Sequence, residues 1–177
     1  MTLKTRYPLQ QAQGVASEIL RRLEPACERI TIAGSIRRQK PVVGDIELLC
    51  IPRFIDGIDQ LDREIGLLVF QHVLGFRRNK LGSRVYGPKN KLMVHVPSGI
   101  GVDIFSTDEV CWPVALVVRT GGEKTNKRIA TAALRKGYHF HAYGSGFSTP
   151  QVDIVCHSER EVFEAVDLPY REPWERD

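Results

Sequence analysis

Three acidic residues lie in apolar runs, where charged side chains are rarely found. Asp45 and Glu47 occupy alternate positions of DIELLCI, and Asp103 interrupts the later run GVDIF. Alternate residues of a strand point to the same face, so the first two acids project together while Ile46 turns to the core. Neighbouring carboxylates repel, and hard oxygen ligands suit Mg²⁺. Three such acids on adjacent strands would hold two ions about 4 Å apart, as in-line phosphoryl transfer requires.

The residues before the first acid fit the same chemistry. Gly34 and Ser35 end the run RITIA, and a turn there would offer backbone N–H groups and a hydroxyl to phosphate oxygens. Arg38 follows one turn later as a phosphate clamp, and Gly44 lets a phosphate approach the backbone. Taken singly, a GS pair is a turn and a DxE pair is a solvated strand face. Their combination with the third acid favours the functional interpretation.

Apolar periodicity places these residues in an α+β chain. After residue 106 the pattern changes from mixed to mostly helical, which predicts a boundary there. Helices are predicted over residues 8–24, 58–73, 108–120, 123–137 and 158–166. Strands are predicted over residues 29–34, 45–51, 75–81, 83–87, 91–96, 101–105 and 138–144.

Charge distribution indicates a candidate partner. The net charge is only +4, but residues 76–91 hold six basic residues and no acid, and residues 119–141 hold six basic residues and one acid. Two basic zones suggest a polyanion-binding surface, and two solvated faces explain the pattern equally well from charge alone. The candidate DNA contacts are Lys80, Arg84, Lys124, Lys127 and Arg128.

Other classes of protein fit poorly. The longest apolar runs are too short to cross a bilayer, and residues 1–11 contain no apolar signal segment. We therefore expect no membrane contact and an intracellular location, in the cytoplasm or in the nucleoid or nucleus. The four cysteines are far apart and form no CxxC pair, which indicates free thiols in a reducing compartment rather than a zinc site.

The order of these motifs resembles the nucleotidyltransferase signature of the family X DNA polymerases, the group of DNA polymerase beta. AGSIRR and VGDIELL are followed by VDIF, then by ALVVRTGGEKTNKRIATAALRKGYHFHAYG and EVFEAVDLPYREPWER. The resemblance covers nearly the whole chain. It implies a palm over residues 1–106, with a mixed or antiparallel sheet and helices on one face. It also implies a small helical thumb with a short β-sheet over residues 107–177, and no N-terminal lyase or fingers lobe.

The resemblance implies a role for each matching residue. Asp45, Glu47 and Asp103 would bind two Mg²⁺ ions, with Mn²⁺ as an alternative, and Asp103 would also activate the primer 3′-hydroxyl. Asn126 would reach the base edge or sugar of the incoming nucleotide. The remaining nucleotide contacts would be Gly34, Ser35, Arg38 and Gly44 at the triphosphate and Thr120, Gly121 and Gly122 in a turn beside the sugar.

Some positions depart from the family pattern. Glu47 stands where the second metal-binding acid is usually aspartate. Val118 and Arg119 replace the aromatic pair that lies against the incoming sugar in relatives, so this pair bears on sugar selectivity. Ala130 replaces an arginine on the template side, and Gly101 lies two residues before the third acid, where relatives often have arginine.

The leading hypothesis is a monomeric, template-directed DNA polymerase. It would add dNTPs to a primer 3′-hydroxyl on gapped or primer–template DNA, in short-gap repair, by two-metal phosphoryl transfer. A nucleotidyltransferase acting on RNA ends, a small molecule or a protein is the alternative, which the departures at Val118 and Arg119 keep open. A non-catalytic nucleic-acid-binding module is a third reading, and the retention of all three acids argues against it.

Overall fold

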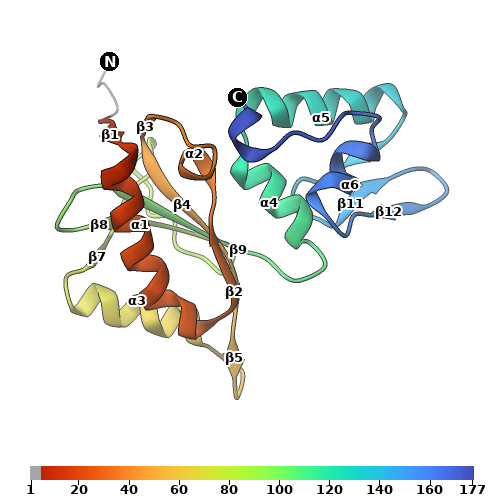
Figure 1. Cartoon of the computed structure of the whole chain (residues 1–177). Helices are drawn as coiled ribbons and strands as arrows, with labels where there is room; N and C mark the ends of the chain where they lie inside the picture. The colour runs from red at the N-terminus through yellow and green to blue at the C-terminus, as the bar shows by residue number, and fades with distance from the viewer. Residues whose placement is uncertain (1–4) are drawn as a thin grey trace. The chain divides into compact units, whose positions relative to one another are not determined.

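The computed structural model describes residues 5–177, which form two compact units with separate hydrophobic cores (Figure 1). The first unit ends at Thr107 and the second begins at Asp108. The fold is α+β: a mixed sheet with helices in the first unit, and helices with a small antiparallel sheet in the second. In residues 5–177, every helix is too short or too polar to span a membrane.

A five-stranded mixed sheet is the centre of the first unit. Its strand order is β2-β4-β9-β8-β7, in which β4 and β9 run parallel and the other neighbours run antiparallel. The predicted strands that carry the acids are confirmed. The five strands are β2 (Cys27–Ile32), β4 (Asp45–Pro52), β7 (Leu74–Phe76), β8 (Asn90–His95) and β9 (Gly101–Ser106).

Two helices cover one face of this sheet, α1 (Leu9–Leu23) and α3 (Gln60–Phe70) (Figure 1). The helix α3 begins at Asp59, whose side chain accepts a hydrogen bond from the backbone N–H of Asp62 at 3.1 Å. Both predicted helices are therefore confirmed, with shorter ends. The side chains buried between sheet and helices include Ala16, Ile19, Ile46, Leu48, Ile65, Val102 and Ile104.

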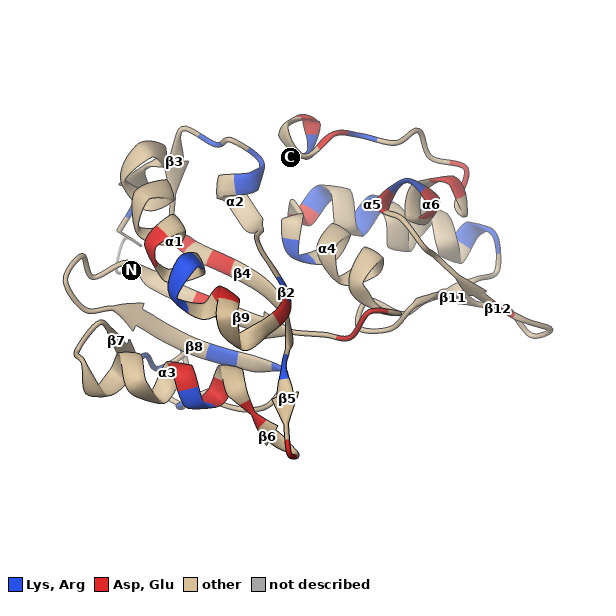
Figure 2. Cartoon of the chain, turned by 60° about the horizontal axis from the view of Figure 1, so that its bottom comes forward, with Lys and Arg blue, Asp and Glu red and all other residues tan. Residues whose placement is uncertain are grey.

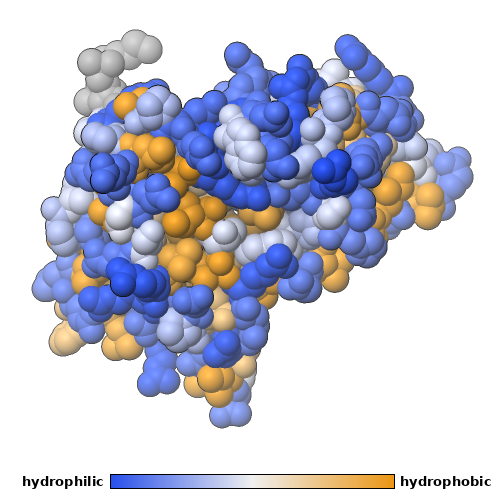
Figure 3. Space-filling model, viewed as in Figure 1, coloured by the Kyte–Doolittle hydropathy of each residue, from blue (hydrophilic) through white to orange (hydrophobic). Residues whose placement is uncertain are grey.

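The remaining elements of the first unit are short. One of them is a hairpin of β5 and β6, whose residues Phe54, Ile55 and Ile58 are exposed. The space-filling view shows hydrophobic surface at this hairpin, at the bottom of the picture (Figure 3). The short elements are β1 (Tyr7–Pro8), η1 (Glu24–Ala26), α2 (Gly34–Arg37), β3 (Val42–Val43), β5 (Phe54–Ile55) and β6 (Ile58–Asp59).

The strands predicted over residues 75–81 and 83–87 are mostly wrong. Beyond Phe76 this segment contains only isolated bridges, and its chain reverses in a turn. The Asn79 side chain accepts hydrogen bonds from the backbone N–H groups of Leu81 and Ser83, both at 2.9 Å. Asparagine side chains that bond the backbone ahead of them favour turns over strands, which explains the difference.

The second unit packs helices against a three-stranded antiparallel sheet. Its helix pair and its capped third helix were predicted: Ser158 accepts a hydrogen bond from the backbone N–H of Glu161 at 3.2 Å. The strand predicted over residues 138–144 is shorter in the structure. The elements are α4 (Trp112–Thr120), α5 (Glu123–Arg135), β10 (His139–Phe140), β11 (Gly146–Ser148), β12 (Asp153–Val155), α6 (Glu159–Glu164) and η2 (Pro173–Glu175).

A fully buried arginine joins the C-terminal segment to this second core. The Arg176 side chain is 0% exposed, and its Nη1 lies 2.9 Å from Glu159 Oε1. Its Nε donates to the Arg171 carbonyl oxygen at 2.9 Å. The guanidinium carbon lies 5.2 Å from the Phe163 ring centroid and 5.6 Å from that of Tyr170. These hydrogen bonds and ring contacts offset part of the desolvation of this charge, and within residues 5–177 the buried Nη2 has no hydrogen-bond partner.

Replacing Arg176 by Met should therefore lower the free energy of unfolding by about 3–5 kcal/mol, because Glu159 would be left buried without its cation. Urea unfolding of the whole chain measures the change. Lys127→Met is the control, since it removes one partner of an exposed ion pair with Glu123 in the same unit. Equal midpoint shifts for the two variants would contradict a stabilising role for the buried pair.

Candidate active site and nucleic-acid surface

The three acids lie on the face of the sheet that α1 and α3 leave uncovered. Ile46, Val102 and Ile104 belong to the core beneath those helices, so the alternate residues Glu47 and Asp103 point the other way. The parallel pairing of β4 with β9 sets Glu47 opposite Asp103 in register. Figure 2 shows acidic positions as red bands on β4. The backbone thus brings the predicted acids of two adjacent strands to one place.

Asp103 and Glu47 each contact another residue closely in the structure. The Arg77 side chain donates from Nη2 to Asp103 Oδ1, although nothing in the sequence pattern pairs these residues. Glu47 lies against Gly34, where a Cβ atom would overlap the Glu47 carboxylate. The backbone also joins these segments, because the Ala33 N–H donates to the Glu47 carbonyl oxygen at 2.8 Å.

The chemistry of these acids fits a divalent cation. Carboxylate oxygens are the ligands that Mg²⁺ and Mn²⁺ take, and adjacent strands lie about 4.8 Å apart, which is close enough for shared ligation. Within residues 5–177, the side chains in their present rotamers form no cluster of three acidic, histidine or cysteine ligands. The register of β4 and β9 places Asp45, Glu47 and Asp103 on one face of the sheet, and their role as metal ligands stays a prediction.

The predicted phosphate-binding residues adjoin the acids in two short segments. Gly34 and Ser35 open α2, and Arg38 ends it with its N–H donating to the Gly34 carbonyl oxygen at 3.1 Å. Gly44 directly precedes Asp45 at the start of β4. Since α2 packs against β4, these residues form one polar border beside the carboxylates, and α2 carries basic residues (Figure 2).

The paired glycines of the second unit join α4 to α5. Gly121 has a φ of 71°, and its peptide bond with Gly122 is cis. A Cβ atom at Gly122 would overlap the backbone of Asp177, so the C-terminal segment packs directly on this turn. Thr125 donates from its hydroxyl to Asp177 Oδ1 at 2.8 Å. That hydrogen bond, with the charges of nearby cations, lowers the pKa of the Asp177 side chain.

Asn126 links the two helices. Its Nδ2 donates to the Val118 carbonyl oxygen at 2.9 Å, which holds the amide toward α4. The Val118 side chain packs against the core of the unit, so the position contributes its backbone to this contact. Arg119 turns elsewhere and lies over the exposed ring of Tyr143, with 5.3 Å between guanidinium carbon and ring centroid.

Comparison with protein families identifies this part of the chain. Residues 115–177 match the family of the DNA polymerase beta thumb. Residues 115–177 are a DNA polymerase beta thumb domain, as found in family X polymerases. This confirms the predicted resemblance over residues 115–177, and no curated protein matches the chain.

One face of the thumb helix α5 is basic. Thr125, Ile129 and Ala133 are buried at helical spacing, which leaves the opposite face to solvent. A groove of about 460 Å³ runs along that face. Its lining comprises the cations Lys124, Lys127, Arg128 and Arg135 with Thr131, Ala132 and Leu168.

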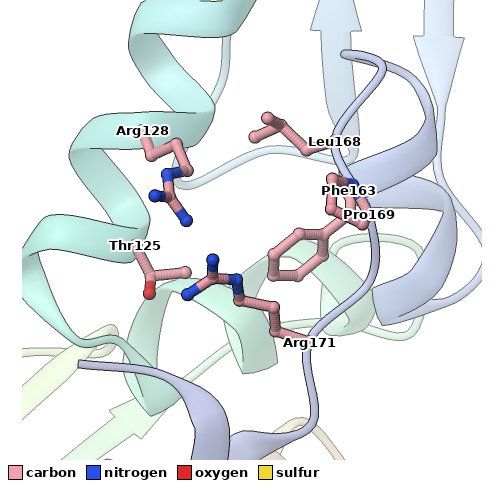
Figure 4. Close-up of a pocket in the computed structure, with 6 residues that line it drawn as sticks. All are labelled: Thr125, Arg128, Phe163, Leu168, Pro169 and Arg171. Carbon is pink, nitrogen blue, oxygen red and sulfur yellow. The ribbon is translucent and has the colours of Figure 1, made fainter.

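A second thumb pocket of about 290 Å³ adjoins this face. Figure 4 shows the guanidinium groups of Arg128 and Arg171 pointing toward one another, beside the Phe163 ring. Sequence analysis missed Arg171, because the segment that contains it is acidic overall and carries no helical periodicity. The thumb therefore adds a cation from its C-terminal segment to the basic face of α5.

The basic zone of the first unit is less uniform. Lys80 is exposed, and Arg84 is exposed but stacks on Phe76, with its guanidinium carbon 3.4 Å from the ring centroid. Lys91 is only 2% exposed and donates to the Gly87 carbonyl oxygen at 3.0 Å. The charge of Lys91 is thus structural, and the zone offers fewer cations to a polyanion than its sequence suggests.

Gly34 has two reasons to be glycine, a φ of +61° and the Glu47 carboxylate in the space of a Cβ. Gly34→Ala should lower the free energy of unfolding by more than the roughly 1–2 kcal/mol expected for the backbone conformation alone. Gly57→Ala is the matched control, because Gly57 has a φ of +77° and nothing within 4 Å of a built Cβ.

Urea unfolding of both alanine variants separates the two effects, since only Gly34→Ala adds the overlap with Glu47. A shift for Gly34→Ala no larger than that for Gly57→Ala would contradict the contact with Glu47.

Proposed function

We propose that the chain is a template-directed DNA polymerase that extends a primer 3′-hydroxyl, in short-gap DNA repair. The observation that carries this proposal is the DNA polymerase beta thumb at residues 115–177. The first unit supports it, since it supplies three carboxylates on one sheet face and a polar border from α2. A DNA polymerase acts on DNA inside the cell, which fits the expected reducing compartment and the four free cysteines.

In this proposal the carboxylates of Asp45, Glu47 and Asp103 hold two Mg²⁺ ions, which supply charge neutralisation at the phosphates when bound. Asp103 accepts the proton of the primer 3′-hydroxyl. Glu47 replaces the shorter aspartate usual in the family, and the packing of its carboxylate on Gly34 accommodates the extra methylene. The chain contributes mainly by positioning and charge, as phosphoryl transfer requires.

In this proposal the polar border of α2 binds the triphosphate of the nucleotide. Ser35 would donate its hydroxyl to a phosphate oxygen, and Arg38 would pair with the triphosphate. Gly44 would let a phosphate approach the backbone next to Asp45. The thumb resemblance assigns sugar contacts to Thr120, Gly121 and Gly122, although all three are buried here and the backbone of Asp177 covers Gly122. It assigns Asn126 to the base edge or sugar.

DNA would bind the basic face of α5 through phosphate contacts. Lys124, Lys127 and Arg128 are exposed on this face, and Arg171 adds a cation beside Arg128. Contacts of this kind hold the duplex without reading its sequence. Lys80 and Arg84 of the first unit would add phosphate contacts of the same kind.

A nucleotidyltransferase acting on RNA ends or on a small acceptor is the second candidate. One observation favours it: neither Val118 nor Arg119, at the positions of the family's aromatic pair, has an aromatic ring that could lie against the incoming sugar. Without that ring a ribose 2′-hydroxyl meets less steric opposition. Offering dNTPs and rNTPs separately distinguishes the two candidates.

Primer extension on a duplex with a one-nucleotide gap tests the reaction. The wild-type chain should add the nucleotide that matches the template base when Mg²⁺ is present. Asp103→Asn should reduce the rate by about 10²- to 10⁴-fold, because the variant lacks the proton acceptor and one ligand charge. Circular dichroism should show that the variant remains folded.

Asp153→Asn is the control, since Asp153 is an exposed carboxylate of the thumb sheet, and its extension rate should equal that of the wild type. Full activity in Asp103→Asn would reject the carboxylate site. Absence of wild-type extension on DNA, with Mg²⁺-dependent transfer to RNA or a small acceptor, would favour the second candidate.

Salt dependence tests the DNA surface. The wild-type affinity for a gapped duplex should fall steeply with salt, because bound cations release counterions from phosphates. Neutralising Lys124, Lys127 and Arg128 together should reduce the slope of log affinity against log salt by about 2–3, given roughly 0.9 per phosphate contact. Fluorescence anisotropy between low and moderate salt measures both slopes.

Neutralising Arg21, Arg22 and Arg63 is the matched control, because it removes the same charge from the helices α1 and α3. Those helices lie on the sheet face opposite the acids. A slope that is flat in the wild type, or that changes equally in both triple variants, would contradict a phosphate-binding role for α5.

A further inference from the structure

We propose that Arg77 is the positioning residue of Asp103: its hydrogen bond to Oδ1 fixes the orientation of the carboxylate that would bind the cation. This inference rests on the proposed function, and it concerns a residue to which neither the sequence pattern nor the family match assigns a role. Three observations support it: the hydrogen bonds that hold Arg77, its close approach to Gly101 and its contact with Asp103.

Arg77 is anchored on the edge of the sheet at three points. It directly follows β7, and its backbone N–H donates to the Leu92 carbonyl oxygen on β8 at 3.1 Å. Its Nε donates to the Met93 carbonyl oxygen at 3.2 Å. Its Nη2 then donates to Asp103 Oδ1 on β9. Two of these contacts fix the arginine independently of the carboxylate, so the carboxylate is oriented by a group that is itself held.

The Arg77 side chain passes close to Gly101, where no side chain blocks it. A Cβ built on Gly101 would lie 3.2 Å from Arg77 Nε and 3.3 Å from its guanidinium carbon. Such distances are tighter than ordinary contact, so a side chain at residue 101 would compete with Arg77 for the same space. Gly101 points to the same face as Asp103 and stands opposite Asp45 in the register of β4 and β9. Arg77 therefore lies within the group of acids.

The charge of Arg77 is suited to positioning. Its Nη2 contacts Asp103 Oδ1, and its Nε is held by the Met93 carbonyl oxygen. The side chain of Asp103 is 16% exposed and that of Arg77 is 32% exposed, so the pair lies at an accessible surface rather than in the core. A charge-assisted hydrogen bond to one oxygen restricts carboxylate rotation, and such supporting contacts tune metal and proton chemistry.

The test compares Arg77→Ala and Arg77→Gln with the wild type in two assays. Single-nucleotide extension should show kcat lowered about 10- to 100-fold, as for loss of a partner of a ligating carboxylate, with KM for the nucleotide changed less. Mn²⁺ titration followed by electron paramagnetic resonance, without nucleotide or DNA, should show weaker binding in both variants. Arg77→Gln keeps most of the side chain over Gly101, so this variant can be tested in both assays even if Arg77→Ala does not fold.

Arg78→Ala is the control, because Arg78 is exposed, donates to the Gly82 carbonyl oxygen at 2.6 Å and lies next to Arg77 in sequence. It removes the same charge from the same segment, and we expect less than a twofold change in kcat and Mn²⁺ affinity. An effect as large as that of Arg77→Ala would mean that net charge, not the contact with Asp103, is responsible, and would overturn the proposal.

Relocating the arginine provides the decisive comparison. In Arg77→Ala the space over Gly101 is vacated, so Gly101→Arg added to that variant can deliver a guanidinium to Asp103 from two residues away on the same strand. The double variant should regain at least part of kcat and Mn²⁺ affinity. Gly101→Arg alone should lower both, because its side chain displaces Arg77.

Two outcomes would overturn the proposal. Unchanged kcat in Arg77→Ala and Arg77→Gln would show that Asp103 needs no such support. Mn²⁺ affinity equal to or above the wild-type value in these variants would show that Arg77 only occupies the place of the cation. Failure of the proposed function is distinguishable, since it is seen as wild-type protein that extends no primer, while the Mn²⁺ titration still compares the variants.

Discussion

The parallel pairing of β4 with β9 is the constraint on which the candidate site depends. It is the single parallel pair in the five-stranded sheet, and it sets Glu47 beside Asp103 and Asp45 beside Gly101. A shift by one residue would turn the acids toward α1 and α3 and the core side chains toward water. Burial of the core under the two helices therefore fixes the register, and the register fixes the acids. The apolar residues of β4 and β9 are in this sense part of the site.

Three glycines, two in the first unit and one in the second, lie in close contact with a neighbouring group. At Gly34, Gly101 and Gly122 the space of a Cβ is taken by another group: the Glu47 carboxylate, the Arg77 guanidinium and the backbone of Asp177. A side chain would overlap the neighbouring group at Gly34 and Gly122, and would crowd Arg77 at Gly101. Gly34 leaves room for the Glu47 carboxylate, and Gly101 leaves room for the Arg77 guanidinium beside the acids. Gly122 lets the C-terminal segment pack on the turn between α4 and α5.

Much of the fold was predictable because it is encoded locally. Alternation identified β4 and β9, apolar spacing identified the main helices, and Ser158 identified the start of α6. The same local rules failed between residues 75 and 87, where the hydrogen bonds of the Asn79 side chain turn the chain.

The candidate site was predictable only in part, for a related reason. The acids could be recognised because each interrupts an apolar strand. The contact of Arg77 with Asp103 joins residues 26 positions apart across two strand pairings, and no periodicity reports it. Arg171 was missed because its neighbours in sequence are acidic, whereas its neighbours in space are Thr125 and Arg128 of α5. Contacts between residues far apart in the sequence could be found only in the structure, because local sequence patterns do not encode them.

The length of α5 limits how much of a polyanion it can follow. Its cations extend from Lys124 to Arg135, a rise of about 16 Å at 1.5 Å per residue. One strand of a duplex carries a charge about every 3.4 Å along the axis, so this row spans about five phosphates. A footprint so short makes each encounter brief. An enzyme that relied on this helix alone would dissociate after few additions, a property suited to filling small gaps and poorly suited to copying long templates.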